Sequence, residues 1–235
     1  GGVERAERLD GAPVAAEFRR LAPPLAGARP PNAVGADTFQ APHLFAFDET
    51  QNVVSETGIA VDVGTDVPPG EVVASHYVFF DPGPSQRLIG WVDFDAPILG
   101  VATSRARLDA SDGLQATGVR YLSPGLRGLE RPEGPWGDRV WIDPEDAHRL
   151  RLDLVAGSPG DYVRVFTRRS PAFVRLGAGV SRAQALAPLR PAPRRAGAAA
   201  SSGQRGRAGA SSGSGPRAAS FSAPAQAMTA ALSVQ

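Results

Sequence analysis

One histidine of the chain directly follows a serine, the pairing that a base-activated nucleophile would need. Ser75 and His76 lie in the apolar stretch VASHYVF, and nucleophilic catalysis would require their side chains to be within hydrogen-bond reach. The stretch is predicted to be a β-strand, in which successive side chains point to opposite faces. His76 therefore cannot activate Ser75, and we expect a half-buried structural histidine bonded to a neighbouring strand or loop.

Two carboxylates and a tryptophan alternate along the segment WVDFDAP. Trp91, Asp93 and Asp95 are expected on one strand face, where residues i and i+2 lie roughly 7 Å apart. That separation is near the range used in glycoside hydrolysis. Because hydrolases place their two carboxylates on opposing walls of a cleft, a solvent-exposed face is the leading interpretation, and sugar or calcium binding is the alternative.

Calcium is the metal that this composition favours, since it takes oxygen ligands from loops. Asp81, at the end of an expected strand, joins Asp93 and Asp95 as a calcium candidate, although none of them stands in a DxDxDG loop. The chain has no cysteine, and its three histidines lack the HxH or HxxxH spacing of a zinc site. No motif requires a cofactor, so we expect none; the alternative is a bound calcium ion.

Aromatic side chains are the second kind of candidate, because flat rings on a strand face can stack against sugars. The candidates for such a ligand-binding patch are Trp91, Tyr77, Trp136 and Trp141. If two or more of the tryptophans form one exposed flat patch, sugar binding is favoured. If all of them are buried in the core, this function is excluded.

The charge distribution argues against specific nucleic-acid binding. Arginine supplies all 25 basic residues. Residues 1–161 carry 24 acidic residues and 14 arginines, a balance of −10, whereas the rest of the chain has 11 arginines and no acidic residue. An acidic body repels a phosphate backbone. No apolar run of about 18 residues is present, so no transmembrane segment is expected in this chain.

The elements that would position these residues are short strands separated by Pro/Gly turns. Residues 71–80, 87–94 and 98–103 read as three consecutive strands of a central meander. The segment RLRLDLVA alternates between polar and apolar residues. The turn SPGD connects it to DYVRVFTR, and we expect the two segments to form a hairpin with Val163 and Val165 pointing inward. No helical pattern alternates with the strands, which argues against a parallel α/β fold.

The two ends differ from the middle of the chain in composition and in the spacing of their apolar residues. Residues 1–36 have an interrupted helical spacing at Val3, Ala6 and Leu9, which predicts a poorly ordered leader or short helical turns. Residues 171–235 consist largely of Ala, Gly, Ser, Arg and Pro, which cannot bury enough apolar surface to order the segment, so we expect a disordered tail. The β-domain is thereby placed at 37–170.

Several segments in this order resemble one family of uncharacterised exported bacterial β-domain proteins, which often carry a PEP-CTERM sorting signal. The resemblance runs over about residues 30–169 and rests on PPNAV, FDETQNVV, VPPGEVVASHYVFFDPG, VDFDAPILGVATS, LDASD, GVRYLSPGLRGLE and SPGDYVRVFTR. It implies export and an extracellular or envelope-associated β-domain, without an activity. The sorting motif and its apolar helix are not recognisable after Arg169, so we interpret the tail as an out-of-frame sequence.

Together these observations predict an all-β protein with a single antiparallel β-sandwich of jelly-roll type. The leading function is that of an exported, non-enzymatic structural or surface/matrix-interaction domain, whose partners would be extracellular polysaccharide or surface components. The alternative is a carbohydrate-binding module supported by calcium. A hydrolase ranks below both, because the sequence offers no complete set of acid, base and nucleophile.

Overall fold

The computed structural model describes residues 1–129 and 137–173, all within one compact unit. Strands dominate this part of the chain. In chain order they are β1 (Gly2–Arg8), β2 (Phe18–Arg20), β3 (Ala33–Val34), β4 (Ala41–Asp48), β5 (Val53–Val54), β6 (Val63–Gly64), β7 (Val72–Asp81), β8 (Gln86–Asp93), β9 (Ile98–Ala102), β10 (Arg120–Tyr121), β11 (Arg139–Ile142), β12 (Arg149–Ala156) and β13 (Asp161–Arg168). The helical elements are α1 (Arg105–Ala110) and the 3₁₀ turns η1 (Asp112–Leu114), η2 (Pro124–Leu126) and η3 (Pro171–Phe173).

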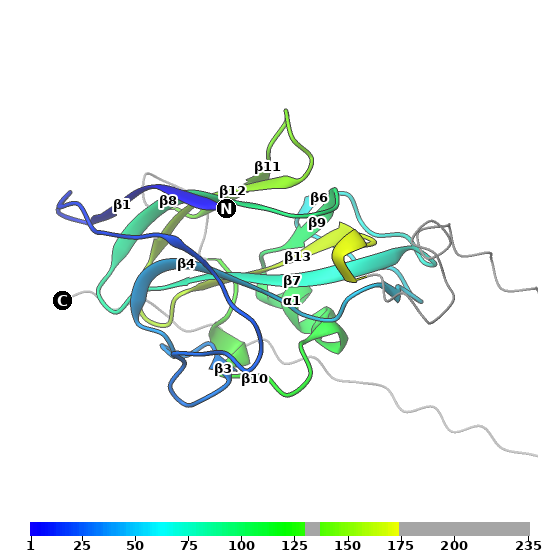
Figure 1. Cartoon of the computed structure of the whole chain (residues 1–235), viewed down its shortest axis with the longest axis horizontal. Helices are drawn as coiled ribbons and strands as arrows, with labels where there is room; N and C mark the ends of the chain where they lie inside the picture. The colour runs from blue at the N-terminus through cyan, green and yellow to red at the C-terminus, as the bar shows by residue number, and fades with distance from the viewer. Residues whose placement is uncertain (130–136, 174–235) are drawn as a thin grey trace, which may run out of the picture. The chain divides into compact units, whose positions relative to one another are not determined.

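Two sheets pack face to face, which confirms the predicted all-β sandwich. A four-stranded sheet has the order β1-β8-β12-β11, and a seven-stranded sheet has the order β2-β4-β7-β13-β9-β6 with β5 beside β7. In Figure 1, β1, β8, β12 and β11 of the first sheet lie above β4, β7 and β13 of the second. Pairing is antiparallel except for β2 with β4 and, in a small separate sheet, β3 with β10.

Alternating leucines build the core between the two sheets. The strand β12 points Leu150, Leu152 and Leu154 inward, where each is almost fully buried, as the RLRLDL pattern predicts. They pack against Val163 and Val165 of β13 in the opposite sheet. Burial of such a side chain stabilises the fold by about 1.5–3 kcal/mol. This core therefore fixes which residues of the four-stranded sheet face solvent.

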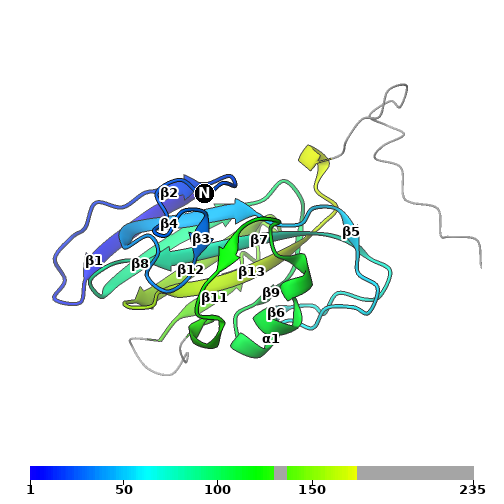
Figure 2. The same ribbon diagram turned by 90° about the horizontal axis from the view of Figure 1, so that it is seen from below.

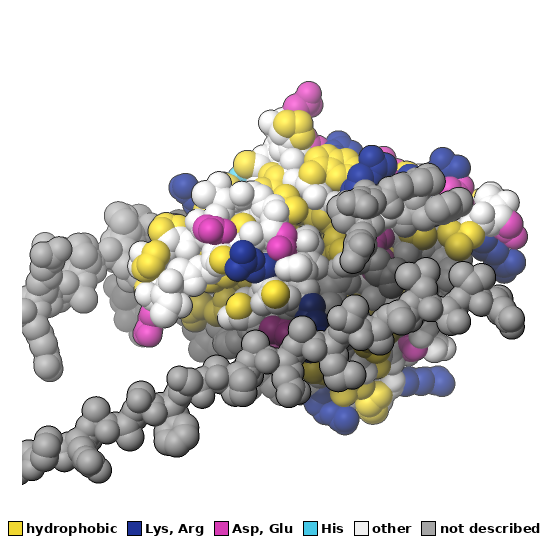
Figure 3. All heavy atoms as spheres, turned by 180° about the vertical axis from the view of Figure 1, so that it is seen from behind, with side chains coloured by type: hydrophobic (Ala, Val, Ile, Leu, Met, Phe, Trp, Pro, Cys, Tyr) yellow, Lys and Arg dark blue, Asp and Glu magenta, His cyan; other side chains and the backbone are white. Residues whose placement is uncertain are grey.

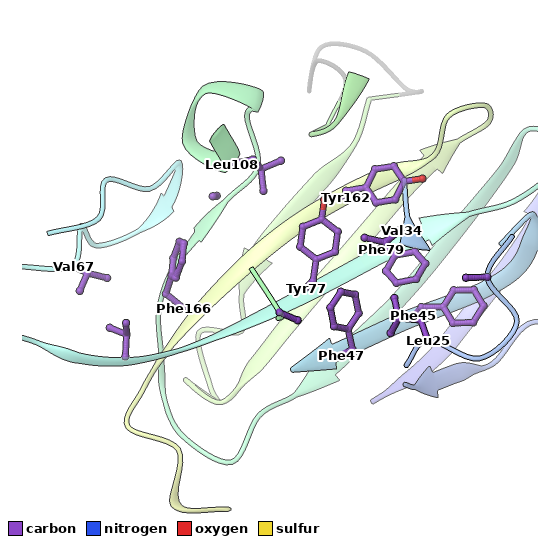
Figure 4. Packing of buried hydrophobic residues seen from close by; sticks show 14 residues of the cluster. Leu25, Val34, Phe45, Phe47, Val67, Tyr77, Phe79, Leu108, Tyr162 and Phe166 are labelled. Carbon is purple, nitrogen blue, oxygen red and sulfur yellow. The ribbon is translucent and has the colours of Figure 1, made fainter. Parts of the chain in front are cut away.

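A third layer covers the other face of the seven-stranded sheet. It contains α1, β3 and β10, drawn below that sheet in Figure 1, and Figure 2 views the molecule from the side of this layer. Strand β7 is consequently buried on both faces over nearly its whole length. In Figure 4 the rings of Phe45, Tyr77, Phe79 and Tyr162 stand on this face of the sheet, toward the layer that carries Leu108 of α1.

Connections between consecutive strands differ from the prediction. The three central strands form where expected, but β8 lies in the four-stranded sheet while β7 and β9 lie in the seven-stranded one, so they are no meander. Likewise β12 and β13 lie in different sheets and form no hairpin. Instead, β8 pairs with β12 and β7 pairs with β13, so two arches stack side by side. This is the folded-ribbon arrangement of a jelly roll.

The first 36 residues are part of the sandwich, which corrects the predicted helical or poorly ordered leader. Strand β1 pairs antiparallel with β8, β2 pairs with β4 and β3 pairs with β10. The register of β1 shifts between Val3 and Arg5. Such a bulge adds a residue to the period-two pattern of a strand, so the three-residue spacing of Val3 and Ala6 resembles a helical one. The β-domain therefore starts near Gly2 instead of residue 37.

The predicted disordered tail, 171–235, lies outside the described residues apart from the single turn η3. No helix in the described ranges is both long and apolar enough to cross a bilayer.

Candidate functional site

The outward side of the four-stranded sheet, called the outer face below, carries a row of side chains that crosses three strands. Trp91 of β8 and Trp141 of β11 are both register partners of Arg151 on the intervening strand β12. Side chains in register on neighbouring strands lie on the same face of a sheet. With neighbouring strands spaced 4.7–4.9 Å apart, the two tryptophan backbones are roughly 10 Å from each other. The row therefore places one guanidinium between two indoles.

Trp91 lies over the backbone of β1 because its partner there has no side chain. Gly2 is in register with Trp91, and a Cβ atom on Gly2 would stand 2.5 Å from the indole atoms Cζ2 and Cη2. The guanidinium carbon of Arg149 is 5.7 Å from the centre of the same ring, within the range of a cation–π contact. These contacts hold the ring in place and leave Trp91 partly exposed.

Trp141 is the most exposed large aromatic group of this row. Its exposed fraction is 37%, whereas Trp91 is of intermediate exposure. Beside it, Arg151 donates from Nε to Asp143 at 2.6 Å and from Nη1 to Glu4 at 3.0 Å. The two carboxylates thus fix the guanidinium between the rings.

The other two aromatic candidates do not join this row. Trp136 lies outside the described residues. Tyr77, predicted to be exposed, is only 2% exposed and packs against Phe47 and Tyr162, which corrects the prediction. The third layer covers the face of β7 on which the Tyr77 ring stands. Burial raises the pKa of Tyr77 far above its usual value.

The two carboxylates predicted to share a strand face separate at the end of β8. Asp93 is the last residue of the strand and accepts a hydrogen bond from Arg149 at 2.7 Å. Asp95 lies in the following turn and accepts hydrogen bonds from the Ser170 hydroxyl at 2.5 Å and from the Ala172 amide at 3.0 Å. Both carboxylates are exposed and each has a structural partner, but only Asp93 lies on the strand.

Asp93 and Asp95 also border a pocket of about 190 Å³ that reaches His76 and Asp48. Pockets that enclose organic ligands are usually about 300–1,000 Å³. Apolar walls from Phe18, Val92 and Phe94 take up much of the lining. The pocket is therefore small for a sugar ring together with a leaving group.

At the base of this pocket, His76 connects an aspartate and a threonine, an arrangement that the sequence did not reveal. Its Nδ1 lies 2.7 Å from Asp48 Oδ1, and its Nε2 lies 3.1 Å from Thr167 Oγ1. Burial opposes ionisation of Asp48, but hydrogen bonds from His76 and Arg20 outweigh it and lower its pKa. The order Asp–His–hydroxyl is that of a nucleophilic triad.

Thr167 cannot act as the nucleophile of such a triad in this conformation. Its residue is fully buried, and it does not border the pocket that reaches His76. A nucleophile must meet the reacting carbon of a substrate at about 3 Å. The three side chains instead join β4, β7 and β13 across the seven-stranded sheet, a structural role like the one predicted for His76, although His76 is fully buried and not half-buried.

Asp81 lies far from the other two calcium candidates, at the arch end of β7. It is fully buried, and its Oδ2 accepts a hydrogen bond from the Phe39 amide at 3.0 Å. Burial, with a contribution from the nearby Asp37 carboxylate, raises the pKa of Asp81 to about 6. Asp81, Asp93 and Asp95 therefore do not form one site. Within residues 1–129 and 137–173, no three His, Cys, Asp or Glu side chains are grouped as metal ligands, and calcium binding stays a prediction.

The raised pKa of Asp81 predicts an unusual pH dependence of stability. The folded state holds this proton more tightly than the unfolded state, whose pKa is about 3.8, so the contribution of Asp81 to stability falls as the pH rises from about 4 to about 6. The expected loss is on the order of 2 kcal/mol. Urea unfolding at pH 4, 5, 6 and 7 measures it.

Asp81→Asn is the matched variant for this measurement. Its amide keeps an oxygen that can accept the hydrogen bond from the Phe39 backbone amide, and it does not titrate in this pH range. We expect the difference in unfolding free energy between the wild type and the variant to shift by about 2 kcal/mol, against the wild type, as the pH rises from 4 to 6. Equal slopes for the two proteins would contradict the assignment of this titration to Asp81.

Comparison of the chain with protein-family models, curated proteins and solved structures finds no match. The resemblance to PEP-CTERM-associated exported proteins is therefore neither supported nor contradicted by these comparisons. The geometry of the outer face is the main evidence on function.

Proposed function

We propose that this chain is a non-enzymatic, exported domain that binds carbohydrate at a cell surface or in an extracellular matrix. The binding site is the outer face of the four-stranded sheet. The observation that carries the proposal is the row Trp91–Arg151–Trp141, in which two partly exposed indoles flank a fixed guanidinium. Export is supported by the sequence resemblance.

Sugar recognition combines the two kinds of group that this row presents. The faces of indole rings offer large rigid apolar surfaces with little conformational entropy to lose, and these stack against the C–H groups of a pyranose. A few fixed polar groups then select orientation through the hydroxyls. The separation of roughly 10 Å between the two tryptophan strands is comparable with the length of a disaccharide unit, so both indoles can contact one chain.

A general hydrophobic docking surface is less well supported by the distribution of side chains. In Figure 3, hydrophobic atoms on the visible described surface are interspersed with acidic and basic ones. Contiguous apolar patches larger than a few hundred Å² are the usual sign of a protein–protein interface. The exposed large hydrophobic residues of the described ranges, Leu9, Val54, Leu126 and Trp141, come from four different segments.

A hydrolase is the second candidate, because Asp48, His76 and a hydroxyl are aligned. It is disfavoured by the burial of Thr167 and by the size of the adjoining pocket. Absence of an enzymatic activity stays a prediction.

Replacing Trp141 by Ala is expected to weaken polysaccharide binding about tenfold or more, since aromatic anchors at binding surfaces typically contribute more than about 1 kcal/mol. A glycan array identifies the ligand, and titration calorimetry then gives the dissociation constant. Leu126→Ala is the matched control, because Leu126 is 65% exposed and lies on η2, away from the outer face. If no glycan binds, or if both variants bind like the wild type, the proposed function is wrong.

A further inference from the structure

Each arginine on the outer face is paired with at least one carboxylate. Five arginines lie on or beside this face, and each contacts a carboxylate within 3.0 Å. The pairs are Arg5–Glu7, Arg87–Asp153, Arg139–Asp153, Arg149–Asp93, Arg151–Glu4 and Arg151–Asp143. Five carboxylates pair with these five guanidinium groups, so each of the five arginines has a counter-charge.

Several of these pairs are held by short hydrogen bonds with good geometry. Arg87 donates from both Nε and Nη2 to the two oxygens of Asp153, each at 2.8 Å, which is the bidentate arrangement. Burial opposes ionisation of Asp153, but its bonds to Arg87 and Arg139 outweigh that effect and lower its pKa. An anionic ligand would have to compete with carboxylates that are already in place.

The paired groups keep hydrogen-bonding capacity that suits a neutral hydroxyl. Arg151 uses Nε and Nη1 for Asp143 and Glu4, and no described residue bonds to its Nη2. A guanidinium has five N–H donors and a carboxylate about four acceptor sites, so each pair can both donate to and accept from a sugar hydroxyl. Such contacts need no change in the net charge of the face.

The row of Trp91, Arg151 and Trp141 also sets the direction in which a bound polymer would run. Trp91, Arg151 and Trp141 are in register across β8, β12 and β11, so a line through them runs perpendicular to the strands. A linear polymer that contacts both indoles must therefore cross the strands and pass over Arg151.

From these observations we infer that the ligand of the outer face is an uncharged linear polysaccharide, bound across the strands over Arg151. The inference rests on the proposed carbohydrate-binding function and narrows its substrate class. Binding is then expected to be insensitive to salt, because a neutral chain has no condensed counterions to release and the arginines it meets are already paired with carboxylates.

The full chain is tested against neutral polymers (cellulose, xylan and mixed-linkage β-glucan) and anionic ones (alginate and polygalacturonate) at 50 and 500 mM NaCl. We expect binding to at least one neutral polymer, with less than a twofold change in dissociation constant between the two salt concentrations. Binding to anionic polymers alone, weakened tenfold or more by salt, overturns the inference and leaves the proposed function standing. Failure to bind any polymer contradicts both.

Glu4→Gln/Asp143→Asn tests the charge argument without removing a side chain, because it frees Arg151 from its two carboxylates. This variant is expected to gain at least tenfold in affinity for alginate at 50 mM NaCl, and the gain should disappear at 500 mM. Glu17→Gln/Glu56→Gln is the control, since it makes the same change in net charge outside the four-stranded sheet. Equal gains in the two variants would show a general charge effect and overturn the role of the outer face.

Discussion

Replacing Arg164 by Met is expected to lower the free energy of unfolding by about 3–5 kcal/mol, the usual cost of removing one partner of a buried ion pair. Arg164 and Glu49 both have fully buried side chains. Nε and Nη2 of Arg164 donate to the two oxygens of Glu49 at 2.6 and 3.0 Å. The variant leaves the Glu49 carboxylate buried without its counter-charge. Urea unfolding, followed by tryptophan fluorescence, measures the loss.

The loss is expected to be large because this pair joins the third layer to the seven-stranded sheet. Nη1 of Arg164 donates to the Leu108 carbonyl at 3.0 Å and to the Ser111 hydroxyl at 2.8 Å. Glu49 in turn accepts from Tyr121 of β10 at 2.6 Å. Since domains are stable by only about 5–15 kcal/mol, removing this junction costs a large part of the total.

Two further variants distinguish the contribution of the ion pair to stability from that of side-chain packing. Arg164→Met/Glu49→Gln removes the uncompensated charge and is expected to recover about 1 kcal/mol or more relative to Arg164→Met. Arg19→Met is the surface control, because its pair with Glu17 is exposed and such pairs contribute about 1 kcal/mol or less. A loss below about 1 kcal/mol for Arg164→Met, or no recovery in the double variant, would contradict the role assigned to the pair.

Arg164 also shows where the sequence stops being informative about the fold. The alternation in DYVRVFTR correctly places Val163 and Val165 in the inter-sheet core. The same alternation sends Arg164 to the opposite face, which a two-layer sandwich would leave in water. That face is covered by α1 and η1, whose docking depends on contacts 50 or more residues apart in sequence, and no local pattern reports such contacts.

The positions of the long strands after residue 37 were predictable because they depend on short-range alternation and on Pro/Gly turns, whereas β1, β2 and β3 were missed. The pairing of the strands was not, because arches and hairpins can have the same turn sequence. The arch is favoured over the hairpin by burial: β7 and β13 have buried side chains on both faces, and both faces are covered only when the two strands pair in the middle of the larger sheet. The jelly-roll class was therefore predictable, whereas the membership of each strand in a sheet required the structure.

The candidate site was predictable only in part, for the same reason. Alternation along β8 places Trp91 and Asp93 outward, as expected. Nothing in the sequence relates Trp91 to Arg151 or Trp141, because cross-strand register between segments 50–60 residues apart is set by the whole sheet. Glu4 and Asp143 were not predicted as site residues, because only their ion pairs with Arg151 connect them to the site.

Phe79→Ala is expected to destabilise the protein by about 3–5 kcal/mol, since it removes a large side chain from a packed core. Phe79 is fully buried, with its ring centre 5.0 Å from that of Phe45 and 5.9 Å from that of Tyr162. Aromatic pairs of this kind contribute about 0.5–1.5 kcal/mol beyond their buried area. Urea unfolding measures the cost, and Phe79→Leu, which keeps more of the volume, should lose less.

The same variant tests whether the two cores act separately on binding. Phe79 lies between the seven-stranded sheet and the third layer, whereas Leu152 lies under the outer face, directly next to Arg151 on β12. Both truncations cost stability, but only Leu152→Ala disturbs the strand that holds Arg151 between the two indoles. At a temperature where both variants are folded, Phe79→Ala should bind polysaccharide within twofold of the wild type, and Leu152→Ala severalfold more weakly. Equal losses of affinity would mean that the outer face depends on the third layer, and that the seven-stranded sheet transmits strain between the two cores instead of separating them.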